Sequence, residues 1–198
     1  LEIAKQYDWI YTISGVSPND IPEEKDNLEE QLNDLEEFIN RELSTHKIVA
    51  IGEIGLDYYW EKDLNKRKIQ NEVFIKQIEL ANKFNLPIVI HTREAVMDTI
   101  QILKKHDVVR KGIFHCCPLN RELVKEALKL GFYISFAGPV TFKNSKNANE
   151  IIDTVPLNKI LIETDSPYLS PEPLRGKRND SRHVKYIAEK IAKVKELS

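Results

Sequence analysis

Glycine is scarce in this chain, with 7 among 198 residues, and neither GxGxxG nor GxxxxGK[ST] occurs. The absence of both loops argues against the nucleotide-binding versions of α/β folds, because their glycines let the backbone approach phosphates. Cysteine is scarcer still, and the only two, Cys116 and Cys117, are neighbours. A bridge between adjacent cysteines is strained, so we expect no disulfide framework and a reducing compartment.

Long apolar runs are also absent, since no stretch approaches the roughly 18 apolar residues that span a bilayer. The first residues carry no basic–apolar–small secretory pattern either. We therefore expect a cytoplasmic protein with no membrane partner and no stable protein partner. The net charge of −2 argues against a broad electrostatic footprint for nucleic acid, although a local basic patch could still act within a screening length of about 10 Å.

Short β-branched runs alternate along the chain with longer amphipathic segments. Most of the runs are continuously apolar, as expected for parallel strands that are buried on both faces. Helical spacing over 28–39 and 65–84 is followed by further helices at 94–105, 120–130 and 181–197. The pattern predicts βαβ units and a parallel sheet, and the scarcity of glycine favours a barrel over an open sheet. The predicted strands are IYTISGV (10–16), KIVAIGEIGL (47–56), LPIVIHT (86–92), KGIFHCC (111–117), GFYISFAG (131–138) and NKILIETD (158–165).

Four of these strands end on a potential metal ligand, namely Glu53, His91, His115 and Asp165. In a barrel the carboxyl ends of all strands meet on the face that carries the active site, so the four side chains would converge. Two imidazoles and two carboxylates suit Zn²⁺, Mn²⁺ or Mg²⁺. Each residue alone has a plainer interpretation, such as capping or turn formation by Asp165 in TDSP. The repetition at four strand ends favours the metal site.

At these residues the sequence resembles the TatD family of metal-dependent deoxyribonucleases, within the amidohydrolase-like barrels. The resemblance runs in order through almost the whole chain and implies a TIM-type (β/α)8 barrel and one hydrolase domain over residues 1–198. The matching motifs are GEIGLDYY (52–59), PIVIHTREA (87–95), FHCCP (114–118), ISFAGPVTF (134–142), ETDSPYLSP (163–171) and RGKRN (175–179).

The resemblance implies a site with two divalent metal ions, Mg²⁺, Mn²⁺ or Zn²⁺. Glu53 would bridge the ions, His91 and His115 would complete one of them, and Asp165 would serve the other. Asp165 would also orient or deprotonate the attacking water. The implied activity is cleavage of DNA phosphodiester bonds by a metal-activated water, as a 3′→5′ exonuclease or an endonuclease.

Basic residues accompany the strand-end ligands. Arg175, Lys177 and Arg178 follow Asp165, and Arg93 lies two residues beyond His91. Because the planar guanidinium group suits phosphate oxygens, we expect these four side chains to bind substrate, although a solvated run of charge is the plainer alternative.

Aromatic residues follow Glu53 in the segment 58–60, Tyr-Tyr-Trp. Aromatic rings bind single-stranded nucleic acid by stacking on the bases, without sequence preference. The same three side chains would serve equally well as packing at the rim of a barrel. The sequence leaves these two interpretations open.

The chain departs from the family pattern at its beginning. The family starts with a strand that carries His-x-His, and no HxH occurs here, nor does the second strand with its helix. We therefore expect the domain to lack its first two β/α units and a short stretch after Ser198, with exposed sheet edges as the consequence. Ser17 also replaces a histidine that usually precedes the proline.

Two other functions stay open on the sequence alone. The same ligands would hydrolyse an ester bond such as that of a D-aminoacyl-tRNA. A fragment with impaired catalysis would act as a binding protein.

Overall fold

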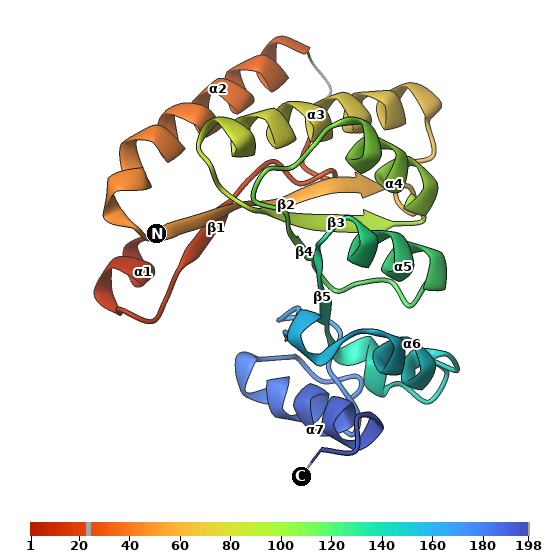
Figure 1. Cartoon of the computed structure of the whole chain (residues 1–198). Coiled ribbons are helices and arrows are strands. Elements are labelled where there is room, and N and C mark those ends of the chain that lie inside the picture. The colour runs from red at the N-terminus through yellow and green to blue at the C-terminus, as the bar shows by residue number, and fades with distance from the viewer. Residues whose placement is uncertain (23–24, 198) are drawn as a thin grey trace. The chain divides into compact units, whose positions relative to one another are not determined.

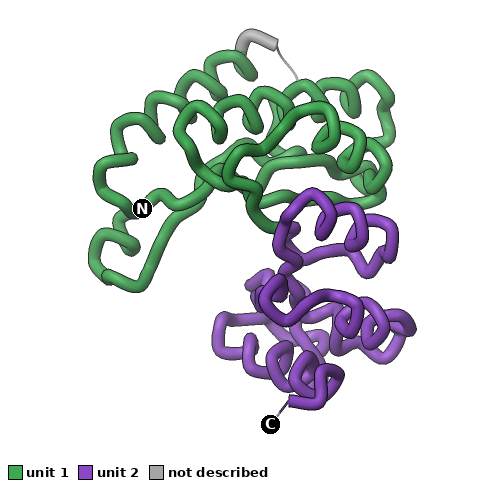
Figure 2. The backbone as a smooth tube through the Cα atoms, in the orientation of Figure 1, with its two compact units in different colours: residues 1–113 green, residues 114–198 purple. Residues whose placement is uncertain are grey.

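The computed structural model describes residues 1–22 and 25–197. By its internal contacts the chain divides into two compact units, residues 1–113 and residues 114–198 (Figure 2). The hydrogen-bonded order of the six strands is their order in the chain, β1-β2-β3-β4-β5-β6. The expectation of one hydrolase domain over 1–198 stays a prediction.

Unit 1 alternates strands and helices as the apolar pattern predicts. Its strands pair in parallel, with Ile13 opposite Ala50 and Gly55 opposite His91. Helices α2 and α3 run side by side over β2 and β3 (Figure 1). The elements are α1 (Glu2–Gln6), β1 (Thr12–Ser14), α2 (Lys25–Glu42), β2 (Ile48–Asp57), α3 (Leu64–Lys83), β3 (Ile88–Arg93), α4 (Val96–Lys105) and the start of β4 (Gly112–Phe114), with a short 3-10 turn at Leu43–Thr45.

Strand β2 is buried on both faces, which explains its almost continuous apolar sequence. Ile51, Ile54 and Leu56 are fully buried, and Phe74 and Ile78 of α3 pack in the same core. In β2 only the side chains of Val49 and Glu53 are exposed. Glu53 is thus the one charged residue of this strand that lies outside the core, because Asp57 at the end of the strand is buried.

Two buried amides on α3 hold the loop that follows β1. Gln77 accepts a hydrogen bond from the Val16 N–H at 2.7 Å and donates to the Val16 carbonyl at 3.0 Å. Gln70, two turns earlier on the same helix face, donates to the Pro18 carbonyl at 3.1 Å. These hydrogen bonds satisfy backbone groups that would otherwise be buried without partners, so they determine the path of residues 16–18.

Unit 2 has a core of large aromatic and aliphatic side chains. Phe114 and Phe132 are buried and meet edge to face, with ring centroids 5.5 Å apart. Strands β5 and β6 pair in parallel, with Ser135 opposite Leu161. The helix α6 was not expected from the sequence. The elements are the end of β4, α5 (Arg121–Lys129), β5 (Tyr133–Phe136), α6 (Ala148–Thr154), β6 (Ile160–Ile162) and α7 (Val184–Val194), with 3-10 turns at Gly138–Thr141, Leu157–Lys159 and Ser181–His183.

Among the described residues, every predicted strand run contains an observed strand, and the five predicted helices correspond to α2, α3, α4, α5 and α7. The apolar periodicity is therefore a sound guide to the elements of this chain. None of the described helices has the length and apolar character needed to span a membrane.

Gly55 is required where β2 lies against β3, because its position leaves no room for a side chain. Its φ is +135°, and a Cβ atom at this position would overlap the backbone carbonyl oxygen of His91. We expect Gly55→Ala to lower the free energy of unfolding by about 3 kcal/mol or more, because backbone strain and overpacking add. Urea denaturation followed by circular dichroism measures the effect.

Gly176→Ala is the matched control. Gly176 also has a positive φ, +82°, but a Cβ atom there would meet nothing within 4 Å. The conformational strain alone should cost about 1–2 kcal/mol. Equal losses in the two variants would contradict the steric explanation for Gly55.

Candidate metal centre

The carboxyl-terminal halves of β2 and β3 bring two of the predicted ligands together in unit 1. Glu53 lies on β2 and His91 on β3, and the His91 Nδ1 atom is 3.1 Å from Glu53 Oε1. The Glu53 side chain is 44% exposed and that of His91 is 21% exposed, so a small ion or a substrate can reach both. The pair forms the first half-site, Glu53–His91.

The other nitrogen of the His91 ring faces a carboxylate that the sequence did not single out. Asp57 Oδ2 lies 3.0 Å from His91 Nε2, and the Asp57 side chain is only 1% exposed. Burial by itself raises the pKa of Asp57. The hydrogen bonds from the Trp60 backbone, the Asn19 amide and the His91 ring outweigh burial, and the pKa is lowered. Asp57 is therefore a buried carboxylate that orients the imidazole.

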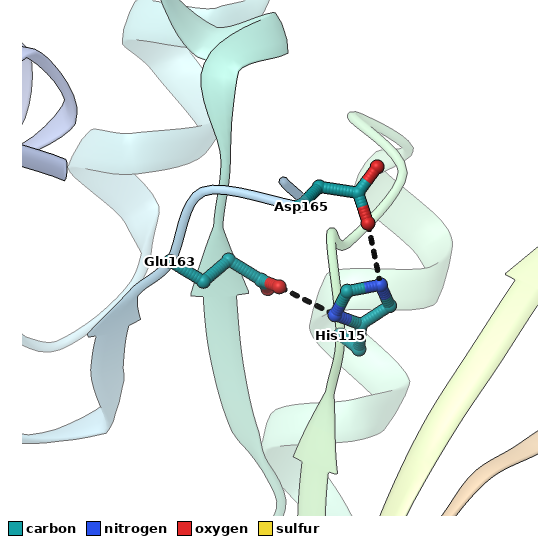
Figure 3. Close-up of side chains that lie close together, drawn as sticks. All are labelled: His115, Glu163 and Asp165. Atoms are coloured by element: carbon teal, nitrogen blue, oxygen red, sulfur yellow. Dashed lines mark ion pairs between the residues drawn. The ribbon is translucent and has the colours of Figure 1, made fainter. Parts of the chain in front are cut away.

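Unit 2 contains a second pair, His115–Asp165. His115 follows β4, Asp165 lies in the loop after β6, and His115 Nε2 is 3.0 Å from Asp165 Oδ1. On its other side, His115 Nδ1 forms an ion pair with Glu163 (Figure 3). One ligand atom from each of His115, Glu163 and Asp165 lies within 4.8 Å of the others.

Glu163 repeats the role that Asp57 has in unit 1. Its carboxylate also accepts a hydrogen bond from the Cys116 backbone N–H at 2.6 Å. Burial acts to raise the pKa of Glu163, but the hydrogen bonds from His115, Ser135 and Cys116 together lower it. The neighbouring Cys117 is buried, which raises the pKa of its thiol and leaves it a packing residue.

The Asp165 turn is held by the last residue of the RGKRN motif. Asp165 adopts a left-handed backbone conformation, with φ of +58°, which is uncommon outside glycine but tolerated by Asp. The Asn179 side chain is 2% exposed and donates at 2.6 Å to the carbonyls of Thr164 and Tyr168, on either side of the turn. Asn179 thereby determines how Asp165 presents its carboxylate.

The basic residues of the same motif are exposed. The Arg175 guanidinium lies 3.7 Å from the centre of the Phe142 ring, a cation–π contact that keeps one face of the group on the protein. Arg178 lines a cavity of about 590 Å³ with residues 166–167, directly after Asp165. Lys177, between them, is exposed. In unit 1 the fourth residue predicted to bind substrate, Arg93, packs on the ring of Tyr59.

The donor sets of the two half-sites fit a divalent cation. Each combines an imidazole nitrogen with an exposed or half-buried carboxylate oxygen, the ligand types that Zn²⁺ and Mn²⁺ share. In each, the ring nitrogen that faces away from this carboxylate is bound to a more buried one, as is usual for metal-binding histidines. These two more buried carboxylates were not predicted from the sequence. Asp57 lies in the GLDYY motif and Glu163 in the ETDSPYL motif, so an acidic residue within a matching motif was the signal that could have identified them.

Glu163→Gln should weaken metal binding by roughly 10- to 100-fold, because the neutral amide no longer holds the His115 ring in its charge-assisted hydrogen bond. Competition between the protein and a fluorescent chelator for Zn²⁺ or Mn²⁺ measures the affinity. Glu122→Gln, an exposed carboxylate on α5 of the same unit, is the control. Unchanged affinity in a folded Glu163→Gln protein would rule out the orienting role.

Comparison with known proteins agrees with this chemistry. The sequence profile described as TatD related DNase matches residues 1–198. An uncharacterized metal-dependent hydrolase of Bacillus subtilis, YabD, is 46% identical over 200 residues, which span all of this chain and 74% of YabD. An uncharacterized metal-dependent hydrolase of Escherichia coli K12, YcfH, is 42% identical over 80% of this chain and 60% of its own length.

The fold has a close counterpart among solved structures. The crystal structure of YjjV, a TatD homolog from Escherichia coli K12, superposes with a TM-score of 0.86 at 26% identity and covers 98% of this chain and 72% of YjjV. This similarity confirms the predicted fold class, the α/β barrel type. The profile match over the whole chain and the identity to YabD lead to the same conclusion, that the chain belongs to the TatD family.

Proposed function

We propose that this chain is a metal-dependent hydrolase that cleaves DNA phosphodiester bonds. The observation that carries the proposal is the pair of histidine–carboxylate half-sites, Glu53–His91 and His115–Asp165, each with a second carboxylate on the far side of the ring. Such an arrangement suits a divalent cation, because each half-site offers an imidazole and a carboxylate as ligands and holds the ring by a second carboxylate.

The family supports the same proposal. The matching profile is described as TatD related DNase, and the relatives YabD and YcfH are named metal-dependent hydrolases. Phosphodiester hydrolysis needs an activated water and compensation of the charge that develops on phosphate oxygens. Imidazole and carboxylate ligands with nearby guanidinium groups supply both requirements.

In this proposal Glu53, His91, His115 and Asp165 hold two divalent ions. When bound, such ions lower the pKa of a water and stabilise the negative charge of the attacking and leaving oxygens. Asp165 has a second task, because its carboxylate can accept the proton of the attacking water. His115, held by Glu163, keeps Asp165 in place through the 3.0 Å contact of its Nε2 atom.

The substrate is DNA, bound through its phosphates. Arg175, Lys177 and Arg178 form an exposed basic segment after Asp165, and Arg93 follows His91 by two residues. Guanidinium groups contact two phosphate oxygens at once, so they fix the strand relative to the ligands. The cation–π contact of Arg175 with Phe142 reduces the freedom that this side chain would lose on binding.

The decisive experiment follows a 5′-labelled single-stranded DNA in the presence of Mg²⁺, Mn²⁺ or Zn²⁺. We expect progressive shortening from the 3′ end or internal cuts, abolished by EDTA. Glu53→Ala and Asp165→Asn should each lower the rate on the order of 100-fold or more, since one removes a ligand and the other the proton acceptor. Glu122→Gln should cleave as the unmodified chain does.

Parallel assays separate the other two functions. An aminoacyl-tRNA ester tested with the same variants would be hydrolysed in place of DNA if the ester interpretation holds. A chain that holds no metal and cleaves neither substrate would be the binding protein. Cleavage of DNA that persists in both Glu53→Ala and Asp165→Asn would overturn the residue assignment.

A further inference from the structure

A cavity in unit 1 lies between the loop after β1 and the start of α3. Its volume is about 300 Å³, at the lower end of the range for small-ligand sites. A site of this size holds one planar ring system rather than a folded peptide or a long chain. Its lining includes the apolar residues Ile21, Pro22, Trp60 and Ile69 and the polar or charged residues Asn19, Glu61, Lys66 and Gln70.

The lining of this cavity combines apolar and polar groups, and part of it is held rigidly. Trp60, Ile69 and Pro22 supply flat or branched apolar surface. Gln70, 4% exposed, forms the floor, and its amide is engaged with the protein, accepting from the Asp57 N–H at 3.0 Å and donating to the Pro18 carbonyl at 3.1 Å. The cavity is therefore preformed, and its mixed lining suits a planar guest with an apolar face and polar edges.

The cavity is joined to the Glu53–His91 half-site through Asp57. The Asn19 amide, on the cavity side, donates at 3.3 Å to Asp57 Oδ2, the oxygen that faces His91 Nε2 at 3.0 Å. The backbone N–H of Trp60, on the other wall, donates to Asp57 Oδ1 at 3.1 Å. The Asp57 carboxylate thus holds two residues that line the cavity, Asn19 and Trp60, and also the proposed metal ligand His91.

Trp60 is unusually exposed for a residue in a preformed wall, with 66% of its surface accessible. The ring contacts Tyr59 edge to face, with centroids 4.8 Å apart. The Arg93 guanidinium stacks on Tyr59 at 3.8 Å and lies 5.7 Å from the Trp60 ring. The three side chains form an exposed aromatic surface with an attached cation, beside His91.

Tyr58 does not take part in this surface. It is 7% exposed, and its hydroxyl donates to Asp98 at 2.6 Å. Of the three aromatic residues that follow β2, Tyr58 packs in the interior, whereas Tyr59 and Trp60 are exposed. The choice between stacking and packing, which the sequence left open, therefore differs from residue to residue.

We propose that this cavity is a nucleobase subsite, in which the base of a nucleotide adjacent to the scissile bond stacks against Trp60. Arg93 contacts the phosphate of that nucleotide. Every base presents an aromatic face, so the subsite selects an unpaired base without reading its identity, and the substrate class is single-stranded DNA or a frayed 3′ end. The subsite deepens the proposed function and rests on it.

The two tryptophans of the chain make a direct binding test possible. They are Trp9 and Trp60, and Trp9 is 76% exposed near β1, in contact with Tyr7. In a Trp9→Phe protein the only tryptophan emission comes from Trp60. With EDTA to prevent cleavage, and at low salt, a short oligothymidine should quench this emission on binding.

An abasic oligonucleotide of the same length and charge is the matched ligand. We expect it to bind roughly 5- to 150-fold more weakly and to leave the Trp60 emission unchanged, which is the range for loss of one stacked base. Trp60→Ala and the cavity-filling Ile69→Phe should lose a comparable factor for oligothymidine, measured by anisotropy of a labelled strand. Trp9→Ala removes a tryptophan that is even more exposed than Trp60, and this variant should bind normally.

The outcomes separate the subsite from the hydrolase. Equal affinity for the two oligonucleotides, with no quenching, would overturn the subsite, whether or not DNA is cleaved in Mn²⁺. Quenching by oligothymidine alone supports the subsite. If that protein still fails to cleave DNA with metal, the nuclease function falls, and the cavity binds an unpaired base but is no subsite of a nuclease. Absence of both binding and cleavage would overturn the two proposals together.

Discussion

The burial of one carboxylate, Asp57, is the constraint on which the functional end of unit 1 depends. A charge that is 1% exposed needs hydrogen bonds, and Asp57 obtains them from the Asn19 amide, the His91 ring and the backbone N–H groups of Tyr59 and Trp60. Those donors come from the loop after β1, the loop after β2 and strand β3. Satisfying a single charge therefore assembles three separate segments around one point.

Unit 2 solves a similar problem with Glu163. This carboxylate draws in His115 and the Cys116 backbone, while Asn179 ties the Asp165 turn to the basic segment. In both units a histidine stands between an inner and an outer carboxylate. The inner residue sets the orientation of the ring, and the outer one is available to a cation. The stability of each half-site is thus supplied mainly by residues other than the proposed ligands.

The elements and the proposed ligands could be predicted from the sequence, because their signals are local. Continuous apolar runs indicate buried parallel strands, and a ligand-type residue toward the carboxyl end of such a run stands out against its apolar neighbours. The seven residues of α6 were missed because two turns of helix carry too little periodicity to stand out. The inner carboxylates were missed for a different reason. Asp57 lies four residues after Glu53 within one motif, and only the twist and register of β2 against β3 determine which of the two turns inward.

Tyr58 and Trp60 illustrate the same limit. They are two residues apart and both aromatic, yet one is a buried hydrogen-bond donor and the other an exposed ring. Their difference arises from two kinds of contact. The Tyr58 hydroxyl reaches Asp98 on α4, 40 residues along the chain, whereas the Trp60 backbone N–H donates to Asp57 within the turn after β2. Composition and spacing give no information on such pairings.

The two proposed ligand histidines offer different ring nitrogens to their outer carboxylates, Nδ1 in His91 and Nε2 in His115. Nδ1 lies close to the backbone and Nε2 at the far tip of the ring, so the two side chains have unequal reach. The amide of asparagine imitates the first position and that of glutamine the second. The two histidines are therefore not equivalent in what could replace them. A short amide at residue 91 or a long one at residue 115 would imitate only the contact with the outer carboxylate, and the contact with the inner carboxylate would be lost.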